Sequence, residues 1–369
     1  MIPISDPKRQ FATLQDEILP KFKDVLLNGQ YILGPNVTTL ENKLAKKLEV
    51  CEAITVANGT DALTLTLHAY GIGNGDEVIT TPFTFFSTAE SITRVGAKPV
   101  FVDVDKQTYN LNPSKIKEKI TSATKAILPV HLFGQPAKMD EIMQIANEHN
   151  LIVIEDACQA FGAEYKNKKI GSIGNATCFS FFPTKNLSTP GDGGVITTSD
   201  HQLANRLRSL RTHGSSKKYF HHEIGYNSRL DEIHAVILLI CLEHIDVWNE
   251  KRIMLANRYN RYLKRIGAIQ LPKQLDDVKH VYHLYCLKSK QRKKWIDHLT
   301  KHNIQTGIYY PRCIHLQEAY QYLGYQQGDF PIAESLAKEL FAIPLFPHLS
   351  IKEQDYVMDV LMEAEVKRL

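Results

Sequence analysis

One lysine and one aspartate carry the strongest chemical signal in the sequence. Lys185 lies in the segment Ser180–Asn186, just before the glycine-rich run Pro190–Gly194. Upstream, an apolar run ends at the carboxylate of Asp156. A lysine amine can hold an aldehyde as an imine, and a carboxylate can keep a pyridine nitrogen protonated so that the ring accepts electrons. The pair therefore predicts a site for pyridoxal 5′-phosphate (PLP), with Lys185 and Asp156 as its catalytic residues.

A second segment suits the phosphate of such a cofactor. Residues 57–63 join a predicted strand to a predicted helix, where Gly59 permits close backbone approach and Thr60 offers a hydroxyl and an N–H. The free N–H groups and the dipole of a helix N-terminus favour an anion. Ordinary helix capping by Thr60 or Asp61 is the alternative. The Asp61 carboxylate would repel a phosphate unless it points away.

Three further residues complete the expected cofactor site. Phe85 follows a predicted strand and is expected to stack on the pyridine ring, although a phenylalanine is equally suited to a core. Gln159, one turn after Asp156, is expected to donate to the ring oxygen, and Ser180 to contact the phosphate. For Asp156 itself, capping of the next helix is the simpler alternative.

A basic stretch, residues 208–222, contains two arginines, two lysines and three histidines. A solvated loop is the simplest interpretation. A site for an anionic substrate such as a diphosphate is the alternative.

The elements that must position these residues alternate between strand and helix. Helical periods such as residues 61–70 and 137–149 separate short apolar runs, which predicts an α/β fold with a mostly parallel sheet between helices. Ligands of such sheets bind beyond the carboxyl ends of the strands, where Thr60, Phe85, Asp156 and Lys185 fall. The seven predicted strands are residues 53–57, 77–80, 99–102, 126–130, 151–154, 177–181 and 194–198.

The pattern changes after residue 230. Two helices, residues 231–244 and 249–266, are followed by a strand at 282–288 and by helices at 291–302, 331–341 and 351–367. We therefore expect a large cofactor-binding domain at residues 1–245 and a smaller C-terminal α/β domain at residues 246–369.

Composition limits the other functional classes. The 369 residues carry a formal charge of only +4, with basic and acidic side chains mixed, which does not indicate a nucleic-acid partner. None of the six cysteines has C-x-x-C spacing and no histidine cluster completes a zinc set, so no metal is expected. No signal peptide and no apolar run long enough to span a membrane are evident, so a cytoplasmic protein with reduced thiols is expected.

Together these motifs resemble the DegT/DnrJ/EryC1/StrS family of PLP-dependent nucleotide-sugar aminotransferases, from residues 29–35 to the C-terminal helices. The resemblance implies fold type I, the aspartate-aminotransferase type, and a homodimer with two shared active sites. It implies Lys185 as the imine-forming residue and Asp156 as the partner of the ring nitrogen. The other cofactor contacts that it implies are Gly59, Thr60, Phe85, Gln159, Ser180 and, toward the neighbouring subunit's cofactor, Asn227.

The resemblance extends to the substrate. The form of residues 227–231 is similar to that of enzymes that aminate C3 of a nucleotide-linked keto sugar, above all WbpE-like 3-aminotransferases of UDP-2-acetamido-2-deoxy-3-oxo sugars. Tyr309-Tyr310 stands where the glucuronate enzyme has His-Tyr, which favours a sugar with a neutral C6. L-Glutamate is the amino donor by analogy. The implied substrate contacts are Arg229, Tyr309, Tyr310, His315 and Gln317.

Several alternatives stay open. The substrate alternatives are a dTDP-3-oxo-6-deoxyhexose, whose enzymes often have Gly where Thr184 stands, and a 4-keto sugar. A sugar dehydratase of the same fold would carry His in place of Lys185. A non-catalytic regulatory protein and a PLP enzyme for ordinary amino acids are the remaining alternatives.

Overall fold

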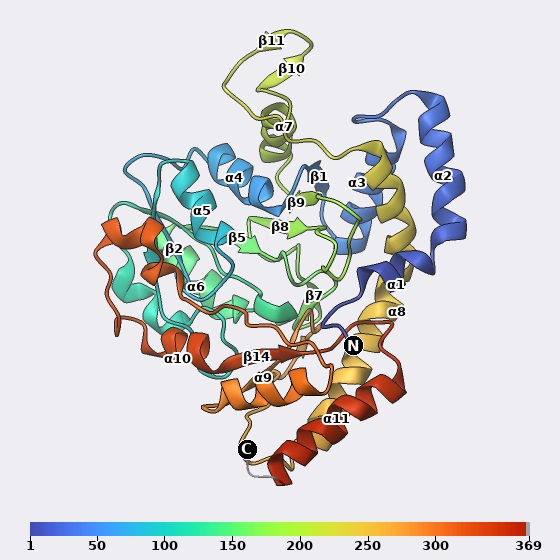
Figure 1. Ribbon diagram of the computed structural model, residues 1–369. Helices are drawn as coiled ribbons and strands as arrows, with labels where there is room; N and C mark the ends of the chain where they lie inside the picture. The colour runs from blue at the N-terminus through green and yellow to red at the C-terminus, as the bar shows by residue number, and fades with distance from the viewer. Residues whose placement is uncertain (367–369) are drawn as a thin grey trace.

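The computed structural model describes residues 1–366 and is built on one central sheet (Figure 1). The sheet has seven strands in the order β1-β9-β8-β5-β4-β2-β3. Strand β9 is antiparallel to both of its neighbours, and the four remaining pairs are parallel. This confirms the predicted mostly parallel sheet. The strands are β1 (Glu52–Val56), β2 (Glu77–Thr80), β3 (Lys98–Phe101), β4 (Thr124–Ile127), β5 (Ile152–Asp156), β8 (Ala176–Ser180) and β9 (Gly194–Thr198).

Helices cover both faces of this sheet because its strands are apolar on both sides. Ile54 and Ile154 pack on one face with α4 (Gly59–Ala69) and α7 (His201–Leu210). Ala53 and Val153, the neighbours of these two residues, pack on the other face. The helices of that second face are α3 (Pro35–Leu48), α6 (Met139–His149) and the first half of α8 (Glu232–Leu263). Strands buried on both faces are expected in a parallel sheet.

The prediction of two separate helices around residue 245 is wrong, since α8 runs unbroken from Glu232 to Leu263. The stretch contains neither Gly nor Pro, and buried residues continue through it at helical spacing. Two polar residues in the stretch, Asn249 and Arg252, are buried and bond to backbone carbonyls of other segments. Asn249 Nδ2 donates to Phe161 O at 3.0 Å, and Arg252 Nη1 donates to Leu345 O at 3.1 Å.

The second half of α8 belongs to another apolar core. It packs with α9 (Arg292–Lys301), α11 (Ile351–Val366), β13 (Tyr285–Lys288) and β14 (Leu340–Ile343). A further cluster joins α10 (Pro331–Glu339) to residues 83–133 of the sheet region. The two main cores meet along α8, and the domain boundary at residue 245 stays a prediction.

Shorter elements surround these cores. The basic stretch forms a small hairpin, β10 (Ser215–Lys217) and β11 (Phe220–His221), that projects beyond α7 in Figure 1. The remaining helices and strands are α1 (Pro7–Ala12), α2 (Gln15–Asn28), α5 (Ser87–Arg94), β6 (Glu164–Tyr165), β7 (Lys168–Lys169) and β12 (Val278–Lys279). Five 3₁₀ turns lie at η1 (Pro113–Lys115), η2 (Lys117–Lys119), η3 (Leu132–Gly134), η4 (Ile314–Leu316) and η5 (Glu318–Leu323).

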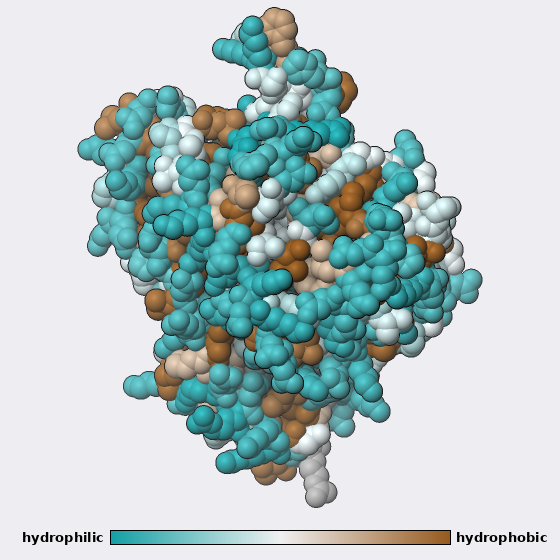
Figure 2. All heavy atoms as spheres, turned by 180° about the vertical axis from the view of Figure 1, so that it is seen from behind, coloured by the Kyte–Doolittle hydropathy of each residue, from teal (hydrophilic) through white to brown (hydrophobic). Residues whose placement is uncertain are grey.

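The surface is mostly polar. Figure 2 shows one face on which hydrophilic residues predominate and hydrophobic residues are scattered. Within residues 1–366, no helix combines the length and apolar character needed to cross a bilayer.

Candidate active site

A cavity of about 580 Å³ opens beyond the carboxyl ends of the central strands. Strand β5 ends at Asp156 and β8 ends at Ser180, and both residues line the cavity. The loop after β1 adds Asn58 and Gly59, and the loop after β2 adds Phe85. These four strands run in the same direction through the sheet, so side chains far apart in sequence meet at one edge of it.

Asp156 is held at the cavity wall by two donors. Its side chain is only 5 % exposed. Thr88, on α5, donates its hydroxyl to Oδ2 at 2.7 Å, and the backbone N–H of Cys158 donates to Oδ1 at 3.2 Å. Each carboxylate oxygen retains a further lone pair for a cationic N–H group. A buried carboxylate fixed in this way suits a protonated ring nitrogen and not a helix cap.

Lys185 reaches the cavity from the loop after β8. The next residue, Asn186, anchors this loop, because its buried amide donates to Asn249 Oδ1 at 2.7 Å and to Val281 O at 3.0 Å. Within residues 1–366, the Lys185 amine forms no hydrogen bond or ion pair. Burial lowers the pKa of Lys185, while Cys158 and Asp156 oppose this shift. The lysine therefore presents an amine that deprotonates more readily than one in water.

The N-terminus of α4 forms another wall. Asn58 is the cap, since its side chain accepts from Asp61 N at 2.8 Å. Capping by Thr60 or Asp61, the alternative raised by the sequence, is therefore not what the structure shows. Gly59 lies so close to β8 that a Cβ there would be 2.8 Å from Ser180 Cβ and 2.9 Å from Cys158 Sγ. Thr60, Asp61 and Ser180 all line the cavity.

Aromatic residues and an amide close the remaining side. Gln159 accepts from Phe133 N at 2.8 Å and donates to Tyr310 Oη at 3.0 Å. These bonds fix its orientation and leave one amide hydrogen for a ligand. Phe85 is 56 % exposed, and its ring centroid lies 6.0 Å from that of Tyr310. A phenylalanine this exposed at a cavity is available for stacking and is not a core residue.

The sequence model of the DegT/DnrJ/EryC1/StrS aminotransferase family matches residues 12–362. The chain belongs to this family. Its enzymes are PLP-dependent sugar aminotransferases, which confirms the predicted reaction class, cofactor and fold.

Three curated relatives illustrate the range of the family. The chain is 45 % identical to the pleiotropic regulatory protein of Geobacillus stearothermophilus, over 98 % of both chains. It is also 45 % identical to the dTDP-3-amino-3,6-dideoxy-alpha-D-galactopyranose transaminase of Aneurinibacillus thermoaerophilus, over 98 % of this chain and 99 % of that one. The UDP-N-acetyl-3-dehydro-alpha-D-glucosamine 3-aminotransferase of Acidithiobacillus ferrooxidans is 43 % identical over 94 % of both.

Among solved structures, the fold is similar to that of DesV from S. venezuelae. The TM-score is 0.97 at 39 % sequence identity, and the match covers 99 % of this chain and 98 % of DesV. The likeness therefore includes the C-terminal part as well as the central sheet.

The cavity of this family member fits PLP on observations of its own. The cavity is lined by the Lys185 amine and by the buried Asp156 carboxylate, which can accept a further hydrogen bond. It is also lined by Gly59 at the N-terminus of α4, which lies too close to β8 to carry a side chain. Lys185 and Asp156 would hold the aldehyde and the ring nitrogen. Gly59, Thr60 and Ser180 would hold the phosphate, and Phe85 and Gln159 the ring.

The structure does not bring every predicted residue to this cavity. Asn227 is exposed and Arg229 half-buried, and neither lines the cavity of its own chain. His315 does not line it either, because its side chain is buried 3.3 Å from the Glu334 carboxylate and against the Phe330 ring. Gln317 also lies outside it, next to the backbone of the preceding loop. Tyr309 and Tyr310 are the predicted substrate residues that do line it.

Sequence reasoning missed other residues in and behind the cavity wall. Thr88 was passed over although it stands three residues after Phe85, because only the folded chain brings it to Asp156. His283 lies in the C-terminal half and lines the cavity; burial, with Lys185 and Arg252 nearby, holds its pKa well below the usual range. Burial, strengthened by Asp156, raises the pKa of the Cys158 thiol. Both side chains are therefore neutral neighbours of the charged groups.

Proposed function

We propose that this enzyme transfers an amino group, with L-glutamate as donor, to C3 of a UDP-2-acetamido-2-deoxy-3-oxo-hexose. The observation that carries the position is the agreement among the relatives. The Acidithiobacillus enzyme is named for a 3-dehydro UDP-sugar, and the Aneurinibacillus enzyme for a 3-amino dTDP-sugar. Two enzymes that differ in nucleotide share carbon 3, so C3 is the feature that this chain is expected to keep.

The charges around the cavity favour a sugar with a neutral C6. Among the described residues that line it, the only lysine and arginine are Lys185 and Arg94. Arg94 Nη2 is already paired with Glu90 Oε1 at 2.8 Å, and His283 is neutral because its pKa is low. Within a single chain, a uronic-acid carboxylate would thus lack a free cationic partner, which an anion in a partly buried site needs. Tyr309 and Tyr310 offer hydroxyls, which suit a neutral sugar.

A dTDP-3-oxo-6-deoxyhexose is the second candidate substrate. The 45 % identity to the Aneurinibacillus transaminase favours it, and a 6-deoxy sugar is also neutral at C6. Thr184, which lines the cavity beside Lys185, favours the UDP-sugar. By resemblance, enzymes for dTDP-sugars often have Gly at this position. The nucleotide is therefore the part of the proposal that needs the experiment most.

We further propose that the enzyme works as a homodimer, with Asn227 reaching the cofactor phosphate and Arg229 the substrate of the partner subunit. The support is their position. Both follow the projecting hairpin, and Asn227 is exposed although its backbone is held by a bridge to Thr212. An exposed polar side chain on a fixed backbone is suited to a neighbouring chain.

When bound, PLP supplies a cationic ring that takes up electron density from the bond being broken. The residues of this chain bind, orient and transfer protons. Asp156 keeps the ring nitrogen protonated, and Thr88 orients Asp156. The Lys185 amine carries the proton between the two reacting carbon atoms, acting first as base and then as acid. Its lowered pKa supports this role, because a permanently charged amine cannot accept a proton.

The test is a panel of UDP- and dTDP-linked 3-amino sugars, each mixed with the PLP form of the enzyme. A substrate of the reverse half-reaction bleaches the visible band of the cofactor. We expect bleaching by the UDP-2-acetamido-3-amino sugar with a neutral C6, slower bleaching by its uronic-acid counterpart, and none with Lys185→Ala. Bleaching by dTDP-sugars alone would overturn the UDP-sugar and support the second candidate, a dTDP-3-oxo-6-deoxyhexose. Bleaching by 4-amino sugars alone would overturn C3.

A further inference from the structure

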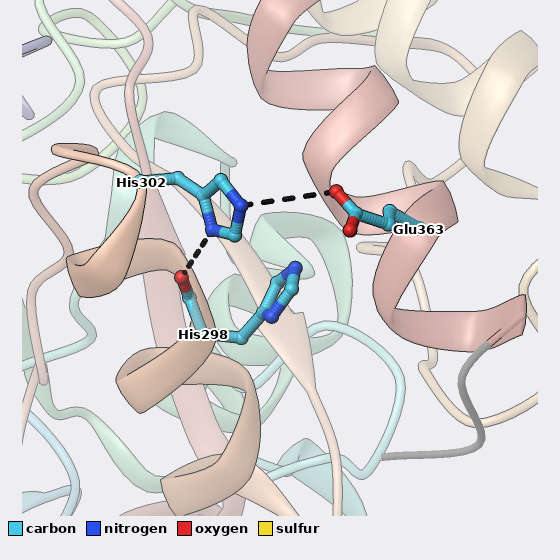
Figure 3. A group of neighbouring side chains, drawn as sticks. All are labelled: His298, His302 and Glu363. Carbon is cyan, nitrogen blue, oxygen red and sulfur yellow. Dashed lines mark hydrogen bonds and ion pairs between the residues drawn. The ribbon is translucent and has the colours of Figure 1, made fainter.

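Two histidines and a glutamate converge at a place remote from the active-site cavity. His298 lies on α9, His302 is one helical turn later at the end of that helix, and Glu363 lies near the end of α11 (Figure 3). One ligand atom from each residue lies within 4.8 Å of the others. None of the three lines the active-site cavity.

The separation of these atoms is near that of ligands around one small cation. Zinc–nitrogen bonds of about 2.05 Å place the ligands of a tetrahedral ion about 3.3 Å apart. His302 Nε2 and Glu363 Oε2 are already 3.7 Å apart. The pairs with His298 lie within 4.8 Å, so they need to close by at most about 1.5 Å, which side-chain rotations can supply.

Backbone carbonyls set the tautomer of His302. Its Nδ1 donates to His298 O at 2.9 Å, so Nδ1 carries the hydrogen and Nε2 presents a lone pair toward Glu363. Metal-binding histidines are commonly fixed in this way by a hydrogen bond at the other nitrogen. His298 Nε2 donates to Val360 O at 3.1 Å. If Nε2 of His298 is the ligand atom, this bond is exchanged for the metal, which weakens binding.

We propose that His298, His302 and Glu363 form a binding site for one divalent transition-metal ion of the zinc class, which joins α9 to α11. Two imidazoles and one carboxylate suit zinc and its neighbours, and do not suit magnesium or calcium. Water completes the fourth position. The two helices pack in the C-terminal core, to which Leu299, next to His298, and Leu361, two residues before Glu363, contribute. A metal there stabilises the packing of two helices and takes no part in the transamination.

The spacing His-x-x-x-His was visible in the sequence, but it did not predict this site. Two residues four apart share one face of a helix. The third ligand comes from a helix far along the chain, and only the packing of α11 on α9 brings it near. This proposal therefore reverses the prediction that the enzyme has no metal site.

The test is equilibrium dialysis of the PLP-loaded, chelator-treated enzyme against low micromolar free zinc, with zinc per chain measured by elemental mass spectrometry. We compare wild type with His302→Ala and Glu363→Gln. The control is His201→Ala, which removes an exposed histidine that is also paired with a glutamate, Glu52. The cofactor's visible band and far-ultraviolet circular dichroism report whether each variant is folded. Glu363→Gln keeps the shape of the side chain if His302→Ala does not fold.

We expect both site variants to bind one zinc ion fewer per chain than wild type and the control. Zinc should raise Tm in the wild type and not in the site variants. Binding should weaken below about pH 6.5, as protons compete for the imidazoles. Equal zinc binding by all four proteins would overturn the proposal, and so would binding that appears only at millimolar zinc.

Discussion

Replacing Thr88 with valine tests how the carboxylate at the cavity wall is held. The substitution keeps the shape of the side chain and removes the 2.7 Å hydrogen bond to Asp156 Oδ2. A hydrogen bond to a charged group contributes about 1.5–3 kcal/mol. If all of this energy is lost in the transition state, the rate falls about ten- to 150-fold. Because Cys158 N still donates to Oδ1, we expect a decrease near the lower end of this range.

The assay is the single-turnover rate of the half-reaction with the amino donor, followed by the visible band of the cofactor. The pH dependence of that band is a second readout, because it reports protonation at the cofactor and not folding. Thr66→Val is the matched control. Thr66 is also a buried threonine, but its hydroxyl donates to Ala62 O and not to Asp156.

We expect Thr88→Val to slow the half-reaction and to shift the pH dependence of the band, whereas Thr66→Val changes neither. If both variants stay within twofold of wild type and their pH profiles coincide, Thr88 does not orient Asp156 for the reaction.

Three other substitutions test separate parts of the structure. Asp156→Asn should slow turnover at least about a hundredfold, near 2.7 kcal/mol, and a loss of only a few fold would exclude the ring-nitrogen role. Gly59→Ala should weaken PLP binding at least about tenfold in titrations of the apoenzyme, since its Cβ would meet Ser180 Cβ at 2.8 Å; unchanged affinity would contradict the close packing. Arg9, by its hydrogen bond, lowers the pKa of Glu353 to about 2, so this pair stabilises the fold fully above about pH 4.5 and less as pH falls toward 2. Glu353→Gln should therefore cost about 1 kcal/mol of unfolding free energy at pH 7 and almost nothing at pH 2, since partial exposure screens the pair; a constant cost in denaturant titrations would refute the assignment.

The sequence was most informative where function depends on strand ends. Short apolar runs predicted the seven central strands to within two or three residues, and a parallel sheet brings its carboxyl ends together. That rule was enough to place Phe85, Asp156 and Lys185 around one cavity without coordinates.

Contacts between distant segments were beyond this reasoning. The bond from Thr88 to Asp156 and the entry of His283 into the cavity depend on packing, which has no local signature. The length of α8 was missed because polar residues such as Asn249 and Arg252 favour exposure, whereas in the structure both are buried and donate to backbone carbonyls of other segments. The proposed contacts of Asn227 and Arg229 are also without a local signature, because their partners belong to a second chain.

The account depends most on the identity of the lysine that binds the cofactor. The direct measurement is borohydride reduction of the PLP-supplemented enzyme, followed by proteolysis and peptide mass spectrometry. We expect a pyridoxyl-phosphate mass on the peptide that contains Lys185, and none on the same peptide from Lys185→Ala. An unmodified Lys185 peptide, or a label mainly on another lysine, would contradict the assignment of this cavity as the active site.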